Sequence, residues 1–208
     1  MAADPYRLQS LVYDRVIDPL NAPLRELARR IAPPTPGEVV LDVGCGTGTA
    51  LAEYRDAGCR VLGADPSPAM LEQARARLGD EADLRLMTDD RVPFEDGCAD
   101  RVLVSLVLHS IPRAEASALL DEVTRVLSTD GRALIIDFGT GPLRFPRGHA
   151  TRALIAVAEL AAGPRHARNA ITYLRSGGLE GLRPDGLTSV QTKPTAGGSI
   201  VIGVLRRA

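Results

Sequence analysis

Short apolar runs alternate with segments of helical periodicity through the middle of the chain. The predicted strands are Val39–Val43, Arg60–Asp65, Leu84–Met87, Asp100–Val104 and Ala133–Asp137. The predicted helices between them are Thr49–Ala57, Pro68–Leu78 and Arg113–Leu127. Ser67 is a good N-cap, and Pro68 is favoured at the first position of the helix that follows it. A repeated strand-then-helix order predicts an α/β fold with a parallel, doubly wound sheet covered by helices on both faces.

The two ends of the chain depart from this alternation. Apolar positions at helical spacing predict a helix over residues 5–17, which ends where Pro19 and Pro23 interrupt the pattern. A second helix is predicted after this break, at Leu24–Ile31. Beyond the fifth strand, the predicted elements are helices at Thr151–Ala162 and Ala167–Arg175 and strands at Thr188–Thr192 and Ser199–Leu205. The last two strands are predicted to form a hairpin.

Composition narrows the class of protein. The chain has 208 residues, of which 45% are hydrophobic and 25% charged, with a formal net charge of −1. This is enough apolar side chain for one full core, which excludes a disordered chain. A nearly neutral chain with 3% aromatic residues gives no reason to expect nucleic acid as a partner. Three cysteines without Cys-x-x-Cys spacing suggest neither a metal site nor a disulfide framework.

The sequence predicts no transmembrane segment. Its first residues lack the charged-then-apolar layout of a signal peptide. The longest apolar run, Ala153–Ala162, contains Glu159 and is far shorter than the roughly 20 residues that cross a bilayer. We therefore expect a soluble, cytoplasmic protein, either a monomer or a homodimer.

The run from Val40 to Gly48 carries the strongest chemical signal. Gly44, Gly46 and Gly48 follow a buried strand at alternate positions and precede a helix. Glycines there allow positive φ or close approach of a ligand, at the edge where open α/β sheets bind ligands. A dinucleotide loop reads G-x-G-x-x-G, whereas this loop reads G-x-G-x-G and is preceded by Asp42. An acid at that point repels pyrophosphate but accepts an ammonium group, which indicates a ligand with an amino-acid end.

Two further acidic positions follow the next strands. The predicted helix after the glycine loop has about nine residues and covers roughly 14 Å, and the strand of five residues that follows runs back roughly 16 Å. Asp65, at the end of this strand, is therefore expected to lie beside the glycine loop. Its carboxylate can accept hydrogen bonds from both hydroxyls of a ribose there. Asp89, after the third strand, is placed to accept a hydrogen bond from an exocyclic amine such as that of adenine. The simpler interpretations are helix capping for Asp65 and solvation for the adjacent acids Asp89 and Asp90.

In order and content these motifs resemble those of class I S-adenosylmethionine-dependent methyltransferases. The resemblance covers residues 36–137 and rests on Val40–Gly48, Val61–Leu71, Asp89–Phe94 and Glu122–Leu127 leading to Gly131. The most similar branch (type 11) acts on small molecules and lipids and includes the ubiquinone and menaquinone biosynthesis methyltransferases. The resemblance implies a Rossmann-like sheet of seven strands in the order 3-2-1-4-5-7-6, with strand seven antiparallel.

The resemblance also implies which residues bind the cofactor, S-adenosyl-L-methionine. They are Asp42, Gly44, Cys45, Gly46, Gly48, Asp65, Pro66, Met70, Asp89 and Asp90. Asp42 and the glycines would surround the methionine part, Asp65 would hold the ribose and Asp89 the adenine amine. Met70 would pack on adenine or, equally well, fill the core. Tyr13 resembles the tyrosine of an N-terminal lid over the cofactor.

The acceptor side is less well defined by the sequence. His109 lies just past the fourth strand, where the acceptor enters, and is the candidate base if the acceptor must lose a proton. The alternative is that His109 only holds its loop by hydrogen bonds. Asp137, which ends the fifth strand, is either an acceptor ligand or a loop cap.

Residues 138–186 are predicted to cover the acceptor. Residues 144–175 contain six arginines and a single acid, Glu159. Such a cluster indicates an anionic substrate, an anionic membrane surface or, more simply, a solvated basic face. Leu154, Val157 and Leu160 recur at helical spacing in this segment, which is more typical of a core-facing stripe than of lipid contact.

The sequence thus predicts one domain, divided into a helical lid (1–35), a cofactor-binding core (36–137), an acceptor-side cover (138–186) and a C-terminal hairpin (187–208). Its predicted activity is methyl transfer from S-adenosyl-L-methionine to a small metabolite or lipid-like acceptor by in-line displacement. One alternative is a non-catalytic, regulatory protein that binds the same cofactor. A nicotinamide dehydrogenase is a second alternative, disfavoured by the glycine spacing and Asp42.

Overall fold

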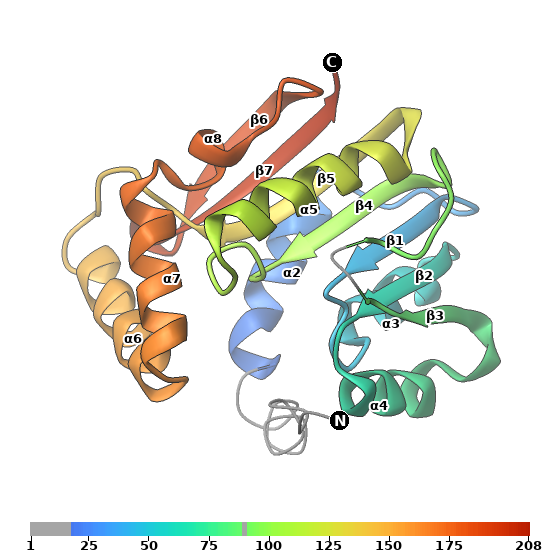
Figure 1. The fold of residues 1–208 in the computed structure, drawn as a ribbon, viewed down its shortest axis with the longest axis horizontal. Coiled ribbons are helices and arrows are strands. Elements are labelled where there is room, and N and C mark those ends of the chain that lie inside the picture. Colours follow the sequence, from blue (N-terminus) through green and yellow to red (C-terminus); the bar gives the residue numbers. More distant parts are fainter. Residues whose placement is uncertain (1–17, 89–90) are drawn as a thin grey trace.

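The computed structural model describes residues 18–88 and 91–208, which form one seven-stranded sheet flanked by helices (Figure 1). The strands are β1 (Val39–Val43), β2 (Arg60–Asp65), β3 (Ala82–Leu86), β4 (Ala99–Ser105), β5 (Leu127–Phe138), β6 (Leu187–Thr195) and β7 (Ile200–Arg207). Their order in the sheet is β3-β2-β1-β4-β5-β7-β6, and β7 runs antiparallel to both of its neighbours. The predicted fold class and strand order are confirmed.

The helices cover both faces of this sheet, with α5 in front of it and α2 behind it in Figure 1. They are α2 (Asp18–Ile31), α3 (Thr49–Asp56), α4 (Pro68–Leu78), α5 (Arg113–Val126), α6 (Arg147–Ala161), α7 (Pro164–Arg175) and α8 (Gly178–Leu182), with single 3₁₀ turns at Gly79–Glu81 and Ala196–Gly198. Ser67 caps α4 as predicted, because its side chain accepts a hydrogen bond from the Met70 amide at 3.2 Å.

The predicted break near the N-terminus is wrong. Helix α2 runs without interruption from Asp18 to Ile31, with Pro23 inside it. Pro23, the sixth residue of α2, cannot donate a backbone hydrogen bond to the carbonyl of Pro19, yet the helix continues through it. The helix predicted over residues 5–17 lies outside the described residues.

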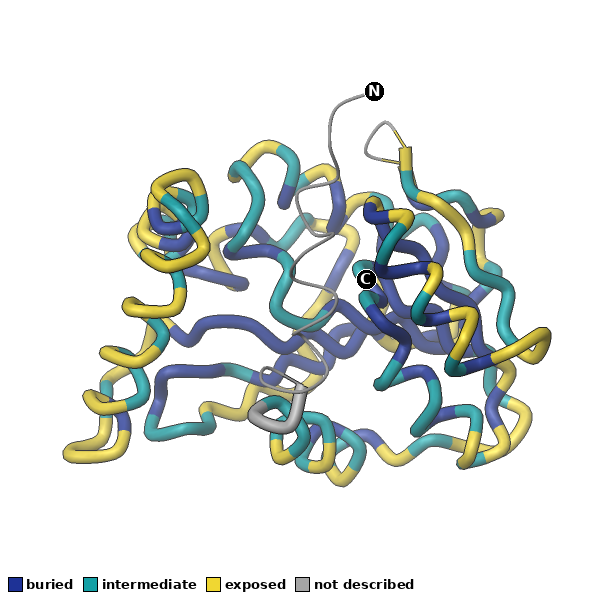
Figure 2. The backbone as a smooth tube through the Cα atoms, turned by 90° about the horizontal axis from the view of Figure 1, so that it is seen from below, coloured by how far each residue is buried: buried dark blue, intermediate teal, exposed yellow. Residues whose placement is uncertain are grey.

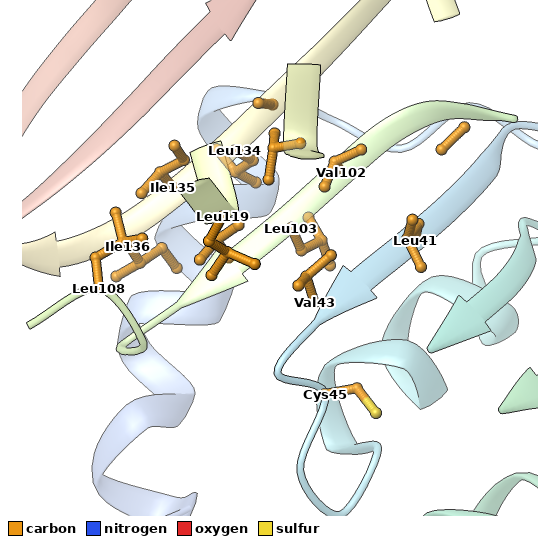
Figure 3. Packing of buried hydrophobic residues seen from close by; sticks show 14 of the residues in the cluster. Leu41, Val43, Cys45, Val102, Leu103, Leu108, Leu119, Leu134, Ile135 and Ile136 are labelled. Atoms are coloured by element: carbon orange, nitrogen blue, oxygen red, sulfur yellow. The ribbon is translucent and has the colours of Figure 1, made fainter. Parts of the chain in front are cut away.

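The core consists of the buried residues of β1, β2, β4, β5 and β7 and of the helices that cover them. Figure 3 shows Leu41, Val102 and Ile135 from these strands and Leu119 of α5, which belong to one cluster of buried residues. All but the first residue of β1 are buried, as expected for a parallel strand with helices on both faces. This packing holds the carboxyl ends of the strands in fixed positions relative to one another.

The strand register places the predicted site residues along one edge. Val43 of β1 pairs with Ala64 of β2, so Asp42 and Asp65 approach the edge on adjacent strands. Ser105 at the end of β4 pairs with Ile136 of β5, which brings the loop after β4 next to Asp137. The four strands β1, β2, β4 and β5 therefore deliver their polar residues to a common edge.

At the opposite end of β4, a buried arginine ties the linker before β1 to the sheet. The Arg101 guanidinium donates to both carboxylate oxygens of Glu38, at 3.0 and 3.1 Å, and to the carbonyls of Ala32 and Pro33, at 2.7 and 3.0 Å. Only 4% of its surface is exposed. Removal of one partner from a buried, hydrogen-bonded ion pair leaves the other charge without compensation.

We therefore expect Arg101→Met to lower the free energy of unfolding by about 3 kcal/mol or more. Equilibrium denaturation in urea measures this change. The matched control is Arg60→Met, at an exposed arginine on β2, for which a change within about 0.5 kcal/mol is expected. Equal stability of the two variants would contradict a structural role for Arg101.

Candidate functional site

The glycine loop between β1 and α3 has three positive-φ glycines, and Gly46 differs from Gly44 and Gly48 in its surroundings. A Cβ on Gly44 (φ +80°) would lie 2.6 Å from Cγ2 of Val107, and one on Gly48 (φ +77°) would lie 2.9 Å from Cδ1 of Leu78. Both positions thus require close packing within the protein. A Cβ on Gly46 (φ +54°) would meet nothing within 4 Å. Gly46 therefore presents its backbone to open space, as a ligand-facing glycine does.

Asp65 joins this loop to the end of β2. Its Oδ2 accepts a hydrogen bond from the Gly46 amide at 2.8 Å, and its Oδ1 accepts one from the Ser67 amide at 2.8 Å. Asp65 therefore contacts the glycine loop, as its spacing in the sequence predicts, and also helps to start α4. A carboxylate oxygen can accept more than one hydrogen bond, so an aspartate at this position suits a ligand with hydroxyl groups.

A pocket of about 230 Å³ lies beside the loop. Its lining residues are Val43, Gly44, Pro66, Met87, Val107, Ile111, Glu115 and Leu119. They come from the segments that follow β1, β2, β3 and β4 and from α5, so the pocket occupies the carboxyl edge of the sheet. Among the residues predicted to bind the cofactor, Gly44 and Pro66 line this pocket.

Asp42 faces a different, smaller cavity of about 30 Å³. Arg25 and Ala28 of α2, Glu53 of α3 and Ser105 of β4 are among its lining residues. Burial and the nearby charge of Asp65 raise the pKa of Asp42 to about 7, against the opposing effect of Arg25. Within the described part of the chain, Oδ1 of Asp42 is buried without a hydrogen-bond partner. A cationic group placed here would compensate this charge.

Two other predicted cofactor residues of the described chain, Cys45 and Met70, are not among the lining residues of either cavity. Cys45 belongs to the glycine loop and its side chain is buried (Figure 3), which raises the pKa of its thiol well above the usual value. Met70 is 6% exposed on α4. Tyr13, Asp89 and Asp90 lie outside the residues that the structure describes.

His109 is held between two carboxylates and an aromatic ring. Its Nδ1 lies 2.7 Å from Oδ1 of Asp137, and its Nε2 lies 3.5 Å from Oε1 of Glu159 on α6. The ring stacks on Phe138 at a centroid distance of 3.7 Å, and only 5% of the residue is exposed. His109 lines neither of the two cavities described above.

Asp137 holds the loop after β4 as well as the histidine ring. Its Oδ2 accepts hydrogen bonds from the amides of Leu108 and His109, at 2.9 and 3.4 Å, and its Oδ1 also accepts one from the Phe138 amide at 2.7 Å. Through these hydrogen bonds the fully buried carboxylate fixes the backbone of the loop after β4. The sequence offered this function as one of its two interpretations of Asp137.

The environment of His109 favours its charged form. Burial alone would lower its pKa, but the charges of Asp137 and Glu159 and the hydrogen bonds to them outweigh burial and raise the pKa to about 9. At neutral pH the imidazole therefore carries two protons and donates from both nitrogens. Sequence reasoning missed Glu159, whose one signal was that it is the only acid among six arginines.

The stripe of apolar residues on α6 does not face the core, which corrects the prediction made from its spacing. Leu154, Val157 and Leu160 are 63%, 63% and 68% exposed. The opposite face of the helix, which carries Arg152 and Glu159, is turned toward the protein and is less exposed. Helical spacing identified the stripe but not the side on which it lies.

Comparison with known proteins supports a methyltransferase domain. Residues 41–135 match the family described as "Methyltransferase domain". A demethylmenaquinone methyltransferase of Clavibacter sepedonicus is 35% identical over 144 residues, which are 66% of this chain and 58% of that protein. A demethylmenaquinone methyltransferase of Beutenbergia cavernae is 35% identical over 62% of this chain and 55% of its own. The chain thus spans less than two thirds of the length of the curated relatives that it matches.

Solved structures show the same fold. The complex of the Haloferax volcanii Trm112 methyltransferase activator and a putative methyltransferase contains a chain that aligns with a TM-score of 0.70 and 17% identity, over 100% of this chain and 99% of that one. The mitomycin 7-O-methyltransferase MmcR aligns with a TM-score of 0.61 and 25% identity, over 88% of this chain and 54% of its own.

The raised pKa of His109 predicts a dependence of stability on pH. Because the folded protein binds the proton more tightly than the unfolded chain, the stabilisation is complete below pH 6.5 and is lost as pH rises through about 9. The expected loss is up to about 3 kcal/mol. Urea denaturation across this range measures it. His109→Gln removes the dependence, and an unchanged slope in that variant would contradict the assignment to His109.

Proposed function

Since the chain has the fold and the matched domain of class I S-adenosylmethionine-dependent methyltransferases, we propose that it transfers a methyl group from this cofactor to a small acceptor. The observation that carries the proposal is the hydrogen bond between Asp65 and the Gly46 amide, which joins the end of β2 to the glycine loop beside the 230 Å³ pocket. The fold, the domain match and the names of the relatives support the same activity.

The residues present fit the cofactor. The open side of Gly46 leaves room for a ligand against the backbone, and Asp65 stands next to it with a carboxylate suited to ribose hydroxyls. Gly44, Pro66 and Met87 line a pocket with the apolar surface that a purine ring requires. The uncompensated Oδ1 of Asp42 suits the cationic, amino-acid end. We therefore place the nucleoside in the larger pocket and the amino-acid end toward Asp42.

S-adenosylmethionine supplies a methyl group on a sulfonium, which an acceptor atom attacks in line. The protein's contribution to such a reaction is mainly alignment and exclusion of water. The loop after β4 lies between the larger pocket and α6, and Val107 and Ile111 of that loop line the pocket. We propose that this loop orients the acceptor.

We propose that His109 positions this loop. At neutral pH its ring is protonated between Asp137 and Glu159, so it has no free nitrogen to accept a proton from an acceptor. Its charge instead ties β5, the loop after β4 and α6 together. A catalytic base would require the opposite protonation state and a nitrogen that faces the substrate.

The relatives and the apolar lining of the larger pocket support a proposal for the acceptor class. Demethylmenaquinone methyltransferases act, by their name, on demethylmenaquinone, and one of them is similar to this chain over 144 residues. We therefore propose a quinone-type or phenolic acceptor, with a phospholipid-type amine as the alternative.

Calorimetric titration with S-adenosylmethionine, S-adenosylhomocysteine and NADH tests the cofactor. We expect binding of the first two alone, and Asp65→Ala weakens it about tenfold or more because a charged hydrogen-bond acceptor is lost. The matched control is Asp80→Ala, at an exposed acid after α4, which leaves affinity unchanged. Selective NADH binding would instead support a dehydrogenase. Cofactor binding without product formation from any acceptor would support a regulatory protein.

The pH dependence of turnover tests the role of His109. If its charged form positions the loop, kcat falls as pH rises through about 9 and the imidazolium is lost. A base would produce the opposite dependence, with kcat rising over the same range. In His109→Gln we expect a lower kcat that no longer falls as pH rises through about 9. Cofactor affinity stays within about twofold, because His109 is not in the pocket lining. Product formation from an acceptor identified by screening measures kcat.

A further inference from the structure

Helix α6 presents a surface that is unusual for a helix facing water. Between residues 153 and 162 every exposed side chain is apolar, and the only polar residue, Glu159, is turned inward. The exposed positions are Ala153, Leu154, Ala156, Val157, Ala158, Leu160, Ala161 and Ala162. An exposed apolar stripe of this length marks an interaction site more often than a chance surface. We call Leu154, Val157 and Leu160, its largest members, the α6 stripe.

The α6 stripe lies at one end of the molecule. Helices α6 and α7 pack together at the end opposite to β3 and α4 (Figure 1), and the tube of Figure 2 is largely in the exposed colour at this end. Phe145, just before α6, extends the apolar surface and is 86% exposed. The larger pocket lies at the carboxyl edge of the sheet, so the stripe is a separate surface.

Exposed arginines flank the α6 stripe on both sides. Arg144 precedes α6, Arg147 is its first residue, and Arg165 and Arg168 lie on the first turns of α7. No ion pair links any of these four arginines to a carboxylate of the described residues. Glu159, the one acid between residues 144 and 175, points instead at His109. The surface therefore combines apolar side chains with uncompensated positive charge.

We propose that the α6 stripe and its arginines bind the surface of an anionic lipid bilayer. An interfacial helix buries its apolar face about 5–10 Å into the headgroup region, while flanking cations pair with lipid phosphates. The 15 residues of α6 cover roughly 22 Å, enough to lie along a membrane but not to cross it. None of the helices in the described ranges, 18–88 and 91–208, has the length and apolarity of a membrane span.

The charge of the surface favours lipid over a second copy of this chain. Two α6 stripes that met face to face would bring their flanking arginines together, and like charges in a poorly solvated contact repel. An anionic bilayer instead compensates these charges while it covers the apolar side chains. This proposal does not depend on methyl transfer, because it concerns a surface outside the candidate site.

Co-sedimentation of the purified full chain with vesicles tests the proposal. We expect the chain to bind vesicles of phosphatidylcholine with about one third phosphatidylglycerol at least tenfold more tightly than vesicles of phosphatidylcholine alone. The measurement needs neither cofactor nor acceptor, so its failure leaves the proposed activity untouched. Absence of binding, or equal binding to both vesicles, would overturn the proposal.

Variants separate the apolar and the electrostatic contributions. The double variant Leu154→Glu with Leu160→Glu is expected to lower the partition coefficient at least tenfold. Its control, Val190→Glu, changes a similarly exposed apolar residue on β6 and leaves binding unchanged. Arg165→Gln and Arg168→Gln each lower it roughly fivefold, whereas Arg60→Gln, on an exposed position of β2, has no effect. All replaced side chains are exposed, so equal melting temperatures confirm that the variants fold.

Light scattering tests whether a second copy of this chain, rather than lipid, covers the α6 stripe. The proposal requires that the α6 stripe be available, so the mass in solution is the same for the wild type and for Leu154→Glu with Leu160→Glu. A dimer that this double variant dissociates would show that a second copy covers the stripe, which would overturn the lipid assignment. Vesicle binding that the double variant retains would overturn it as well.

Discussion

Buried carboxylates at the ends of strands are the constraint on which the candidate site depends. A charge in a poorly solvated position must be compensated by hydrogen bonds or by an opposite charge. Asp65, at the end of β2, is compensated by the amides of Gly46 and Ser67. Asp137, on β5, is compensated by the amides of Leu108 and Phe138 and by the ring of His109. Each carboxylate therefore fixes a loop by the same interaction that stabilises its own charge.

Asp42 is the exception that indicates a ligand. It is as well buried as the other two carboxylates, yet its Oδ1 lacks a partner among the described residues and its pKa is raised to about 7. A protein that only needed stability would gain by replacing such a group with an apolar one. The charge of Asp42 becomes favourable when a cation approaches, which suits the amino-acid end of the proposed cofactor.

The sequence was sufficient for the sheet but not for the surroundings of the site. Strands such as Val39–Val43 and Arg60–Asp65 could be predicted because apolar runs between turn residues determine parallel strands locally. The contact between Asp65 and the glycine loop could also be predicted, since element lengths set it. The pairing of Glu159 with His109 could not, because it joins residues 50 positions apart through the docking of α6. The direction of the α6 stripe depends on the same docking.

The docking of α6 links the two surfaces that the chain presents. Glu159 lies on the face of α6 that meets His109, while Leu154 and Val157 lie on the face turned away. One rigid helix therefore has its charged side in the cluster that holds the loop after β4 and its apolar side on the proposed membrane surface. The same docking of α6 therefore decides both which acid meets His109 and which side chains face outward.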